Sequence, residues 1–347
     1  MRDVKGTLQY ILKRLLLMFF TFLVIFIICF TLIRMLPVSF ATGVGQDEDI
    51  IRRQMVLQHR MKIVNGEYVP TPIIEQFFYY IKNVFFPPVD PNTGETLSRF
   101  GYSYYIEKWS TPDELLFKKF PPTVIINVYS LIFSVPIGLG LGIFMALRKN
   151  KWEDNFLSVL IMLLISVPSF VDAFVLQYLF SYAWHILPSQ VLAVQNFDGN
   201  WLHPEMFRSM ILPIISMSLG SIAGYARYTR AELTEVLTSD FMLLARTKGL
   251  TRAQATVRHA FRNSLVPIFP MILGEIISIL GGSIIIEKIY GVNGVGDLLL
   301  SAINARDLDV YQFVSMFYIL IGLVGGLVVD VSYGLVDPRI RMGGGKS

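Results

Sequence analysis

Six long stretches of the sequence are almost free of charged residues, and each is long enough to cross a membrane as a helix. The hydrocarbon core of a bilayer is about 30 Å thick, which an α-helix of about 20 apolar residues spans. Three of the stretches each contain one acid, Asp172, Glu275 or Asp330. The pattern predicts six transmembrane helices, at Leu15–Ile33, Pro121–Leu147, Asn155–Pro188, Ser209–Ala226, Asn263–Ile286 and Val310–Val336.

The first apolar stretch has a second interpretation, as a secretory signal peptide that is removed. A signal peptide has a shorter apolar region, followed by a cleavage site of small residues. Here the apolar run continues to Arg34-Met35-Leu36-Pro37, and no such site follows it. The pattern therefore favours a helix that is retained.

Composition supports a membrane protein and excludes several other classes. Hydrophobic residues make up 53% of the 347 positions and charged residues 16%, whereas soluble proteins carry about 25% charged residues. This much apolar surface excludes a soluble enzyme and a disordered regulator. The single cysteine, Cys29, excludes an internal disulfide, and the four histidines are too scattered to predict a metal site.

The basic residues predict the orientation of the chain. Loops on the cytoplasmic side of a membrane carry an excess of Lys and Arg. The N-terminus, the C-terminus and the connections 148–151 and 227–262 together contain 17 Lys and Arg, whereas the short loops on the other side contain 3. Both termini are therefore expected in the cytoplasm.

These helices and loops divide the chain into three parts. Residues 1–37 form a cytoplasmic tail and the first helix, residues 38–120 an extracytoplasmic segment, and residues 121–347 a five-helix core with the cytoplasmic loop 227–262. In the middle part, Asn65-Gly66 suits the turn of a type I′ hairpin between two short strands. Residues 73–86 have aromatic residues at helical spacing, which predicts a helix at the membrane surface. Its aromatic side chains either pack against the helices or form a docking surface for a partner.

The cytoplasmic loop predicts two helices separated by a glycine. Ala231–Lys248 is rich in helix-forming residues, and Gly249 suits the left-handed position that ends a helix. Thr251 and Gln254 match a capping box that starts a second helix over about Arg252–Asn263. There Val257 and Phe261 lie one turn apart as an apolar ridge. Alternatively, the basic residues of this loop only set the orientation; a DNA-binding helix-turn-helix is disfavoured because both ends of the loop are held by transmembrane helices.

The loop also resembles a known family, the permease subunits of binding-protein-dependent ABC importers. Asp240–Pro267, DFMLLARTKGLTRAQATVRHAFRNSLVP, is similar to the coupling loop of the peptide (oligopeptide/dipeptide) subfamily, in its B-type subunit. The subfamily pattern A-R-x-K-G-L followed by R-H-A-x-x-N is matched throughout, although only Ala245 and Gly249 fit the more general family pattern. Further similarities are spread along the chain, including Phe100-Gly101-Tyr102-Ser103, Ile286-Glu287 and Asp337-Pro338-Arg339-Ile340-Arg341. The hairpin at Asn65-Gly66 departs from the family pattern as an apparent insertion.

The resemblance implies an all-α polytopic membrane protein with six transmembrane helices, a cytoplasmic coupling helix and an α/β-containing extracytoplasmic segment. It implies a multi-pass subunit of the bacterial cytoplasmic (inner) membrane that is not itself an enzyme. The implied partners are a second permease in a heterodimer, two cytoplasmic ATPase subunits that bind ATP and Mg²⁺, an extracytoplasmic substrate-binding protein, and a peptide substrate; no nucleic acid or chain-bound cofactor is implied. The residues expected to couple this chain to the ATPases are Ala245, Arg246, Lys248, Gly249, Arg258, His259, Phe261 and Arg262.

Polar side chains near the middle of the predicted helices are candidates for the translocation pathway. Charge in hydrocarbon is costly, so such residues have a function or an interhelical partner. The candidates are Asn127, Asp172, Gln177 and Glu275. We expect Asn127 and Gln177 to hold helices together. For Asp172 and Glu275 a structural and a functional role remain open, and the resemblance does not extend to Asp172.

Helix packing and bending leave further marks in the sequence. Two groups of glycines, Gly138/Gly140/Gly142 and Gly322/Gly325/Gly326, suit close contact between helices. Three prolines are expected to kink the helices that contain them. They are Pro136, Pro168 and Pro270.

Two short motifs suggest enzymes but lack the required context. Gly343–Ser347 resembles the end of a phosphate-binding loop. The full pattern requires a glycine five positions before Gly345, where the sequence has Ile340, and a helix directly after the loop, whereas the sequence ends at Ser347. Gly294-Val295-Gly296-Asp297 matches the string of intramembrane aspartyl proteases. That chemistry needs two aspartates facing each other within the membrane, whereas Asp297 lies in a predicted loop.

Two alternative functions remain beside a peptide importer. The same importer class also serves oligosaccharides and nickel, and the pathway candidates do not separate these substrates. A self-contained secondary transporter would show internal repeats and broken helices around a midplane ion site. No repeat is evident in the sequence, and an exposed coupling loop argues against this class.

Overall fold

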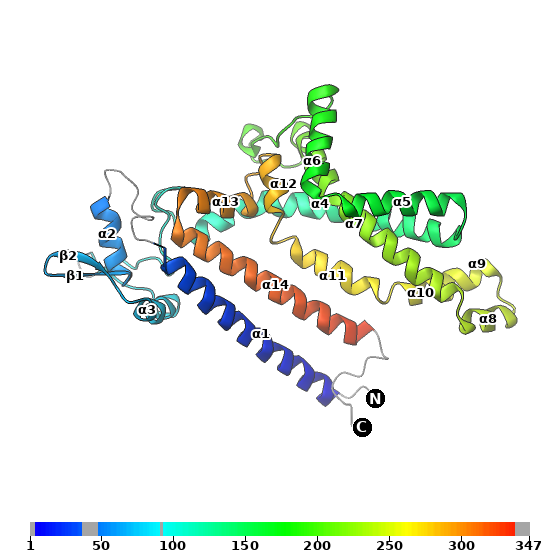
Figure 1. Cartoon of the computed structure of the whole chain (residues 1–347), viewed down its shortest axis with the longest axis horizontal. Helices are drawn as coiled ribbons and strands as arrows, with labels where there is room; N and C mark the ends of the chain where they lie inside the picture. The colour runs from blue at the N-terminus through cyan, green and yellow to red at the C-terminus, as the bar shows by residue number, and fades with distance from the viewer. Residues whose placement is uncertain (1–3, 37–47, 91–92, 337–347) are drawn as a thin grey trace. The chain divides into compact units, whose positions relative to one another are not determined.

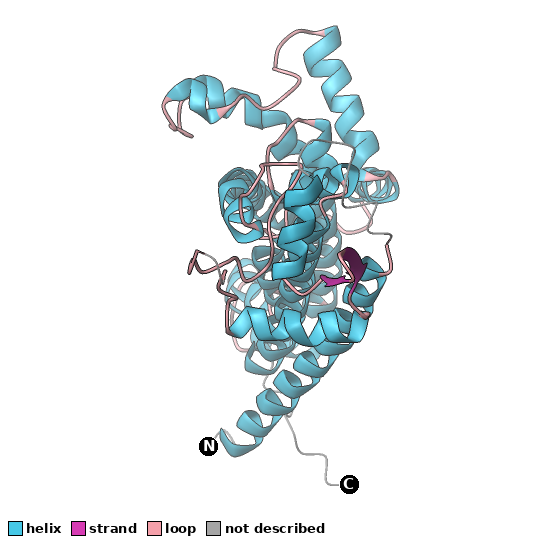
Figure 2. Ribbon diagram, turned by 90° about the vertical axis from the view of Figure 1, so that its left-hand side faces the viewer, coloured by secondary structure: helices cyan, strands magenta, loops and turns pink. Residues whose placement is uncertain are grey.

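The computed structural model describes residues 4–36, 48–90 and 93–336. The chain is mostly helical, and its described residues contain one two-stranded sheet (Figure 2). It forms two compact units: unit 1 is Met1–Leu16, Pro122–Asn293 and Gly322–Ser347, and unit 2 is Leu17–Pro121 and Gly294–Ile321. The division into three parts expected from sequence stays a prediction.

Among the described residues, four helices are long and apolar enough to cross a membrane by themselves (Figure 1). They are α1 (Val4–Arg34), α4 (Pro112–Leu147), α7 (Pro204–Leu237) and α14 (Leu308–Val336). Two bent helix pairs raise the number of candidate spans to six. The helical membrane fold class is therefore confirmed, and the third and fifth predicted spans are each divided.

The third predicted span is broken at Pro168. Helix α5 (Trp152–Ser166) and helix α6 (Ser169–Gln177), which continues as η2 (Tyr178–Ala183), meet at a bend of 100°. A residue before proline is disfavoured in helical conformation, and Val167 is extended, with φ −80° and ψ 128°. The expected kink at Pro168 is thus confirmed as a complete break, whereas α4 continues as one helix through Pro136.

The fifth predicted span is also divided. Helix α11 (Ile268–Ser278), whose first turn contains Pro270, is followed by a non-helical segment and then by the short α12 (Ile284–Ile289). In between, Gly282 has φ +65°, a conformation that ends helices. The prediction of one helix from Asn263 to Ile286 is therefore wrong.

The prediction of one helix over Ala231–Lys248 is wrong, because two helices divide this range. Helix α7 already begins at Pro204 and ends at Leu237, and a separate helix α8 (Asp240–Thr247) follows. The hydroxyl of Thr238 donates to the carbonyl oxygen of Glu235 at 2.9 Å. Such local hydrogen bonds compete with helix continuation, which explains the break.

Close packing of α4 against α7 organises the membrane part of unit 1. A Cβ at Gly138 would lie 2.6 Å from Cβ of Tyr225, and one at Gly142 would lie 2.5 Å from Cβ of Thr229. These two glycines therefore confirm the expected helix contact. Gly140, Gly322 and Gly326 have open space at the Cβ position, so the expectation is wrong for them within this chain.

The segment after the first helix folds within unit 2. Helix α2 (Glu48–Leu57) precedes the hairpin of β1 (Met61–Val64) and β2 (Glu67–Pro70), in which Val64 pairs with Glu67. The turn residues Asn65 and Gly66 both have positive φ, 53° and 84°, as the predicted type I′ turn requires. The hairpin prediction is confirmed.

Helix α3 (Ile73–Phe85) confirms the predicted helix, and its aromatic residues lie on two faces with different surroundings. Phe77 and Tyr80 contact Phe30 of α1, with ring centroids 5.4 and 5.5 Å apart. Phe78 and Phe85 point away and are 66% and 68% exposed. The packing interpretation is therefore confirmed for one face of the helix, and a docking role for the exposed face stays a prediction.

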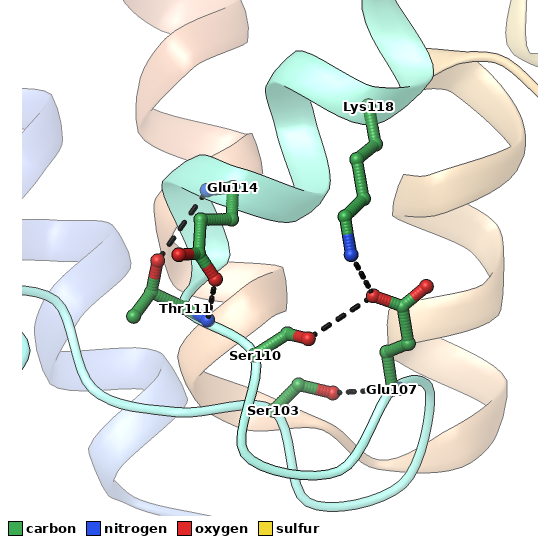
Figure 3. A network of polar contacts seen from close by, with 6 residues as sticks. All are labelled: Ser103, Glu107, Ser110, Thr111, Glu114 and Lys118. Atoms are coloured by element: carbon green, nitrogen blue, oxygen red, sulfur yellow. Dashed lines mark hydrogen bonds and ion pairs between the residues drawn. The ribbon is translucent and has the colours of Figure 1, made fainter.

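A polar network fixes the start of α4 in unit 2 (Figure 3). The hydroxyl of Thr111 accepts from the Glu114 amide, and the Glu114 carboxylate accepts from the Thr111 amide. This is a capping box, which satisfies free amides at the first turn of a helix. Lys118, one turn further along α4, donates to the Glu107 carboxylate. The remaining helix of unit 2 is α13 (Val295–Ala305).

Candidate functional site

The loop between α7 and α11 contains a sharp elbow at Gly249. Helix α8 ends at Thr247, and Gly249 has φ +93°. The Gly249 amide donates to the Arg246 carbonyl at 3.0 Å, and the Leu250 amide donates to the Ala245 carbonyl at 3.3 Å. These two bonds satisfy carbonyls that a helix end leaves free. The left-handed glycine predicted from sequence is confirmed.

A capping box starts the next helical segment directly after the elbow. The Thr251 amide donates to Oε1 of Gln254 at 3.1 Å, and the Gln254 amide donates to Oγ1 of Thr251 at 3.3 Å. The segment runs through α9 (Arg252–Ala255), η4 (Thr256–Ala260) and α10 (Phe261–Ser264). The predicted second helix is confirmed, with a π-helical centre that the pattern did not indicate.

The short helices rest on the ends of longer ones through small side chains. Ala245, Ala255 and Ala260 are buried in a cluster that includes Leu233 of α7 and Ala146 of α4. Alanine side chains allow backbones to approach closely, so the whole loop is held against α7, at whose end Figure 1 shows it. Ala245, expected among the coupling residues, is 9% exposed and acts here as packing.

The opposite side of these helices is an exposed apolar and basic surface. Leu243, Leu244 and Val257 are 62%, 55% and 66% exposed. Phe261, which was expected to form an exposed apolar ridge with Val257, is partly buried rather than fully exposed. The basic side chains on the same helices are exposed; they are Arg246, Lys248, Arg258, His259 and Arg262. We use the name α8–α10 surface for the three exposed apolar residues together with these five basic residues.

A buried ion pair connects α7 to the turn between α4 and α5. Asp154 is fully buried and accepts from Nε and Nη2 of Arg230 at 2.5 and 2.7 Å. Its Oδ2 also accepts from the Asn150 amide at 2.9 Å. A two-bond arginine–carboxylate pair fixes both partners in orientation as well as distance. The pair therefore couples the position of this turn to α7, which carries the α8–α10 surface.

Two of the four pathway candidates hold backbone in place. Gln177 is 8% exposed, and its amide donates to the carbonyls of Ser189 and Ile289 at 2.7 and 3.2 Å. The Asn127 amide donates to the Thr123 carbonyl of its own helix at 2.7 Å. Gln177 thus joins separate segments as expected, whereas the hydrogen bond of Asn127 stays within α4.

The two acidic candidates differ in their surroundings. Glu275 of α11 accepts from Oγ of Ser221 at 2.7 Å and from the Tyr225 hydroxyl, both on α7. Asp172 lies half-buried in the first turn of α6, and no side chain among the described residues hydrogen-bonds to it. Within the described part of the chain no hydrogen bond connects any two of the four candidates.

The sequence did not single out the buried acid Glu287. It is 2% exposed, and its Oε1 accepts from Oγ1 of Thr123 at 2.9 Å. A Cβ at Gly282 would lie 2.1 Å from the same oxygen, so only glycine leaves room for the carboxylate. Tyr290, three residues further along the chain, is also fully buried, and its hydroxyl donates to the Ala173 carbonyl at 2.9 Å. The available signal was that Glu287 occurs within Ile286-Glu287, one of the motifs that resemble the family.

Unit 2 contains a second buried acid that the sequence analysis missed. Oδ2 of Asp307 accepts from Oγ of Ser103 at 2.7 Å and from the amides of Tyr104 and Tyr105 at 3.0 and 3.1 Å. Asp307 is fully buried, and burial raises its pKa above the ordinary value, while these hydrogen bonds act in the opposite direction. The carboxylate therefore fixes the loop that follows the Phe100-Gly101 motif.

Comparison with known proteins finds one matching family model and relatives that align over nearly the whole chain. Residues 138–342, which include the entire loop between α7 and α11, match the family model described as "Binding-protein-dependent transport system inner membrane component". The chain is 31% identical to the dipeptide transport system permease protein DppB of Bacillus subtilis, over 96% of this chain and 98% of that protein. It is 28% identical to the glutathione transport system permease protein GsiC of Escherichia coli K12, over 96% and 99%.

One similar solved structure is an inward-facing conformation of the MetNI methionine ABC transporter. The similarity has a TM-score of 0.49 at 14% identity and covers 66% of this chain and 99% of that chain.

Proposed function

The chain belongs to the binding-protein-dependent transport system inner membrane component family, and from this we propose that it forms the pathway of a peptide importer together with a second, different permease. It is a multi-pass inner membrane permease of an ABC importer, a family that is not itself catalytic. The proposed further partners are two cytoplasmic ATPase subunits and one extracytoplasmic substrate-binding protein. Peptide is proposed as the substrate because the similar permeases DppB and GsiC belong to dipeptide and glutathione systems.

The observation that carries this proposal is the α8–α10 surface. Its buried alanine side holds it rigidly against α4 and α7, while Leu243, Leu244 and Val257 are exposed to solvent beside basic residues. Exposed apolar side chains with a charged rim are typical of protein interfaces. We propose that each ATPase-driven change moves this surface, and that α7 transmits the movement to the membrane helices.

This proposal requires the α8–α10 surface to lie in the cytoplasm. The excess of Lys and Arg in residues 227–262 supports that orientation, and with it cytoplasmic termini. ATP and Mg²⁺ then belong to the partner ATPases. The glycine-rich tail, Gly343–Ser347, lies outside the described residues.

Broken membrane helices do not by themselves favour a secondary transporter. The bends of 100° between α5 and α6 and of 51° before α11 are the kind of feature found in such transporters. Each break has a local cause, however, in Pro168 or in the turn before α11, and the family match identifies an ABC importer subunit.

The proposal is tested by purification followed by transport measurement. Affinity-tagged chain is isolated in mild detergent, and its copurifying proteins are identified by mass spectrometry. We expect an ATPase and a second permease in stoichiometric amounts, and ATP-dependent uptake of labelled dipeptide in vesicles that also contain the binding protein. Uptake by the purified chain alone, without ATP or partners, would contradict the proposal. The variant Val257→Asp should lower ATPase recovery, whereas Val64→Asp, in the hairpin of unit 2, should not.

A further inference from the structure

Helix α3 of unit 2 buries its amide side chains and exposes large apolar ones. Gln76 and Asn83 are 8% and 6% exposed, whereas Ile74, Phe78 and Phe85 are 68%, 66% and 68% exposed. The three apolar residues follow one another at helical spacing, which places them on one face of the helix. We call them the α3 stripe. A surface helix of a soluble protein has such a stripe facing its core, so the outer face of α3 is not suited to water.

The buried side of α3 faces a cluster of charges. The Arg34 side chain is 5% exposed, and its Nη2 lies 3.7 Å from Oδ1 of Asp309. The same oxygen accepts from Nη1 of Arg60 at 2.7 Å. Gln76 and Asn83 line a small cavity together with these three residues. Because charge in contact with hydrocarbon is costly, this arrangement suits a helix that has ions on one side and lipid on the other.

The contact with α1 places α3 near one end of a membrane span. The candidate span in α1 is Gln9–Arg34, and the Phe77 ring of α3 lies 5.5 and 5.4 Å from the rings of Phe26 and Phe30. These two residues precede the end of the span by about 12 and 6 Å along the helix axis, at 1.5 Å per residue. The whole span is about 39 Å long, which exceeds the hydrocarbon core of about 30 Å. The contact therefore lies close to the boundary between acyl chains and headgroups.

Helix α3 crosses α1 rather than running beside it. Figure 1 shows α3 almost end-on, whereas α1 extends along the page. A helix that crosses a membrane span near its end lies roughly in the plane of the bilayer surface. Interfacial amphipathic helices bind in this orientation, with their apolar face buried about 5–10 Å into the boundary of headgroups and acyl chains.

The surroundings of the α3 stripe match both layers of this boundary. At the level where α3 attaches, α1 exposes Ile28 and Leu32, which are 52% and 60% exposed. Lys82 is an exposed residue of α3, and Nη1 of the exposed Arg99 donates to the Val84 carbonyl at 2.9 Å. Long basic side chains at an interface keep their stems on apolar surface and their charge among the headgroups. Apolar and cationic groups are therefore both available to lipid here.

We propose that α3 lies in the interface of the lipid bilayer, with the α3 stripe among the acyl chains. Lys82 and Arg99 would contact headgroup phosphates beside it. The partner is thus the lipid surface at the C-terminal end of α1, which is the outer leaflet in the orientation proposed above. Immersion of α3 fixes the depth of unit 2 in the membrane and keeps lipid away from the ion pairs of Asp309. The inference requires only that α1 spans the membrane, and it does not depend on peptide import.

Spin labelling of the full-length chain in phospholipid vesicles tests the position of α3. The single native cysteine is removed by Cys29→Ala, and a nitroxide is attached to Phe78→Cys or Phe85→Cys. Ile28→Cys on α1 is the reference for contact with lipid, and Glu67→Cys, an exposed position of β2, is the reference for water. For each label, accessibility to oxygen, which concentrates in hydrocarbon, is compared with accessibility to a water-soluble nickel complex. Far-UV circular dichroism checks that each labelled chain is folded.

We expect the ratio of oxygen to nickel accessibility at Phe78 and Phe85 to be several-fold higher than at Glu67 and close to that at Ile28. Two results would overturn the proposal. High nickel accessibility at the α3 stripe would show that it contacts water, and low accessibility to both reagents would show that protein covers it. Because neither ATP nor transport enters the measurement, such a failure leaves the proposed import function untouched.

Discussion

The amide of Leu250 donates to the carbonyl of Ala245 across the elbow at Gly249. Ala245 is a buried residue of α8, and Leu250 packs against the same alanine-rich cluster. The two helical segments on either side of the elbow are therefore fixed to each other and to α7. A rigid connection of this kind transmits a displacement applied at the α8–α10 surface, whereas a flexible loop would absorb it.

The variant Gly249→Ala should strain the elbow without producing a clash. Residues with a side chain pay roughly 1–2 kcal/mol in the left-handed region, and the position has φ +93° with open space around the added Cβ. We expect a small loss of thermal stability and normal membrane insertion. Thermal unfolding in detergent measures this, with Gly224→Ala as control, because Gly224 is helical and also has open space. Equal stability of Gly249→Ala and wild type would show that the elbow is not constrained as described.

Two glycines one half-turn apart on α4 should respond in opposite ways to the same substitution. Gly142→Leu places a side chain against Thr229, where Cβ alone would lie 2.5 Å from the Thr229 Cβ. Overpacking costs about 1–3 kcal/mol, so the melting temperature should fall. A Cβ at Gly140 has no atom of the described residues within 4 Å, and replacing a helical glycine gains up to about 1 kcal/mol. A fluorescence-detected thermal shift distinguishes them, and equal destabilisation by both would argue against the α4–α7 contact.

Removing Arg230 should leave the buried Asp154 carboxylate without its positively charged partner. Loss of one member of a buried pair costs about 3–5 kcal/mol, and we expect the lower end because the Arg230 side chain is 30% exposed. Arg230→Met should therefore destabilise unit 1 strongly. Arg227→Met is the matched control, since Arg227 is exposed on the same helix. If the two variants unfold at the same temperature, the ion pair does not hold the α4–α5 turn to α7.

Asp307 should make unit 2 less stable as the pH rises. Its folded pKa is raised by burial, so the folded state binds more protons than the unfolded state between the ordinary pKa, about 3.9, and the raised value. Stability is then highest below the ordinary pKa and falls as pH increases through this window. Asp307→Asn keeps an acceptor oxygen for the amides of Tyr104 and Tyr105 and should remove this dependence.

Glu107 provides an internal comparison of opposite sign. The hydrogen bond from Lys118 lowers the pKa of Glu107, so its contribution is present above the ordinary pKa and is lost as pH falls. Glu107→Gln should therefore remove the part of the stability that the wild type loses through Glu107 as the pH falls. Melting temperatures of both variants across the acidic range check the two signs. A pH profile of Asp307→Asn identical to that of the wild type would contradict the assignment.

The sequence predicted local structure well where the cause was local. Asn65-Gly66, Gly249 and the Thr251–Gln254 capping box each depend on residues that lie next to one another, and all three are confirmed. The division of the fifth span was missed because the apolar pattern continues through it. The helix break at Thr238 was missed because helix-forming residues stand on both sides of it. Hydrophobic periodicity indicates burial, and it does not show whether the backbone stays helical.

The missed functional candidates depend on contacts between distant parts of the chain. Asp309 lies 249 positions from Arg60, with which it pairs, and Asp307 binds a loop about 200 positions earlier. Nothing in the local pattern around these aspartates marks them, since Asp307 and Asp309 stand at an ordinary helix start. In contrast, the loop of the α8–α10 surface was identifiable, because a continuous motif carries it.

The most direct test of the account compares ATP hydrolysis with substrate uptake in the same vesicles for Gly249→Trp. A Cβ at Gly249 would have no atom of the described residues within 4 Å, so the elbow, which adjoins the α8–α10 surface, has open space where the tryptophan side chain starts. Gly249→Ala serves as the matched control, since it introduces the same backbone strain without the bulk. We expect the tryptophan variant to insert and assemble in the membrane, yet to lose ATP-driven uptake that the alanine variant largely retains. Uptake by Gly249→Trp at the wild-type rate would contradict the proposal that this surface couples ATPase movement to transport.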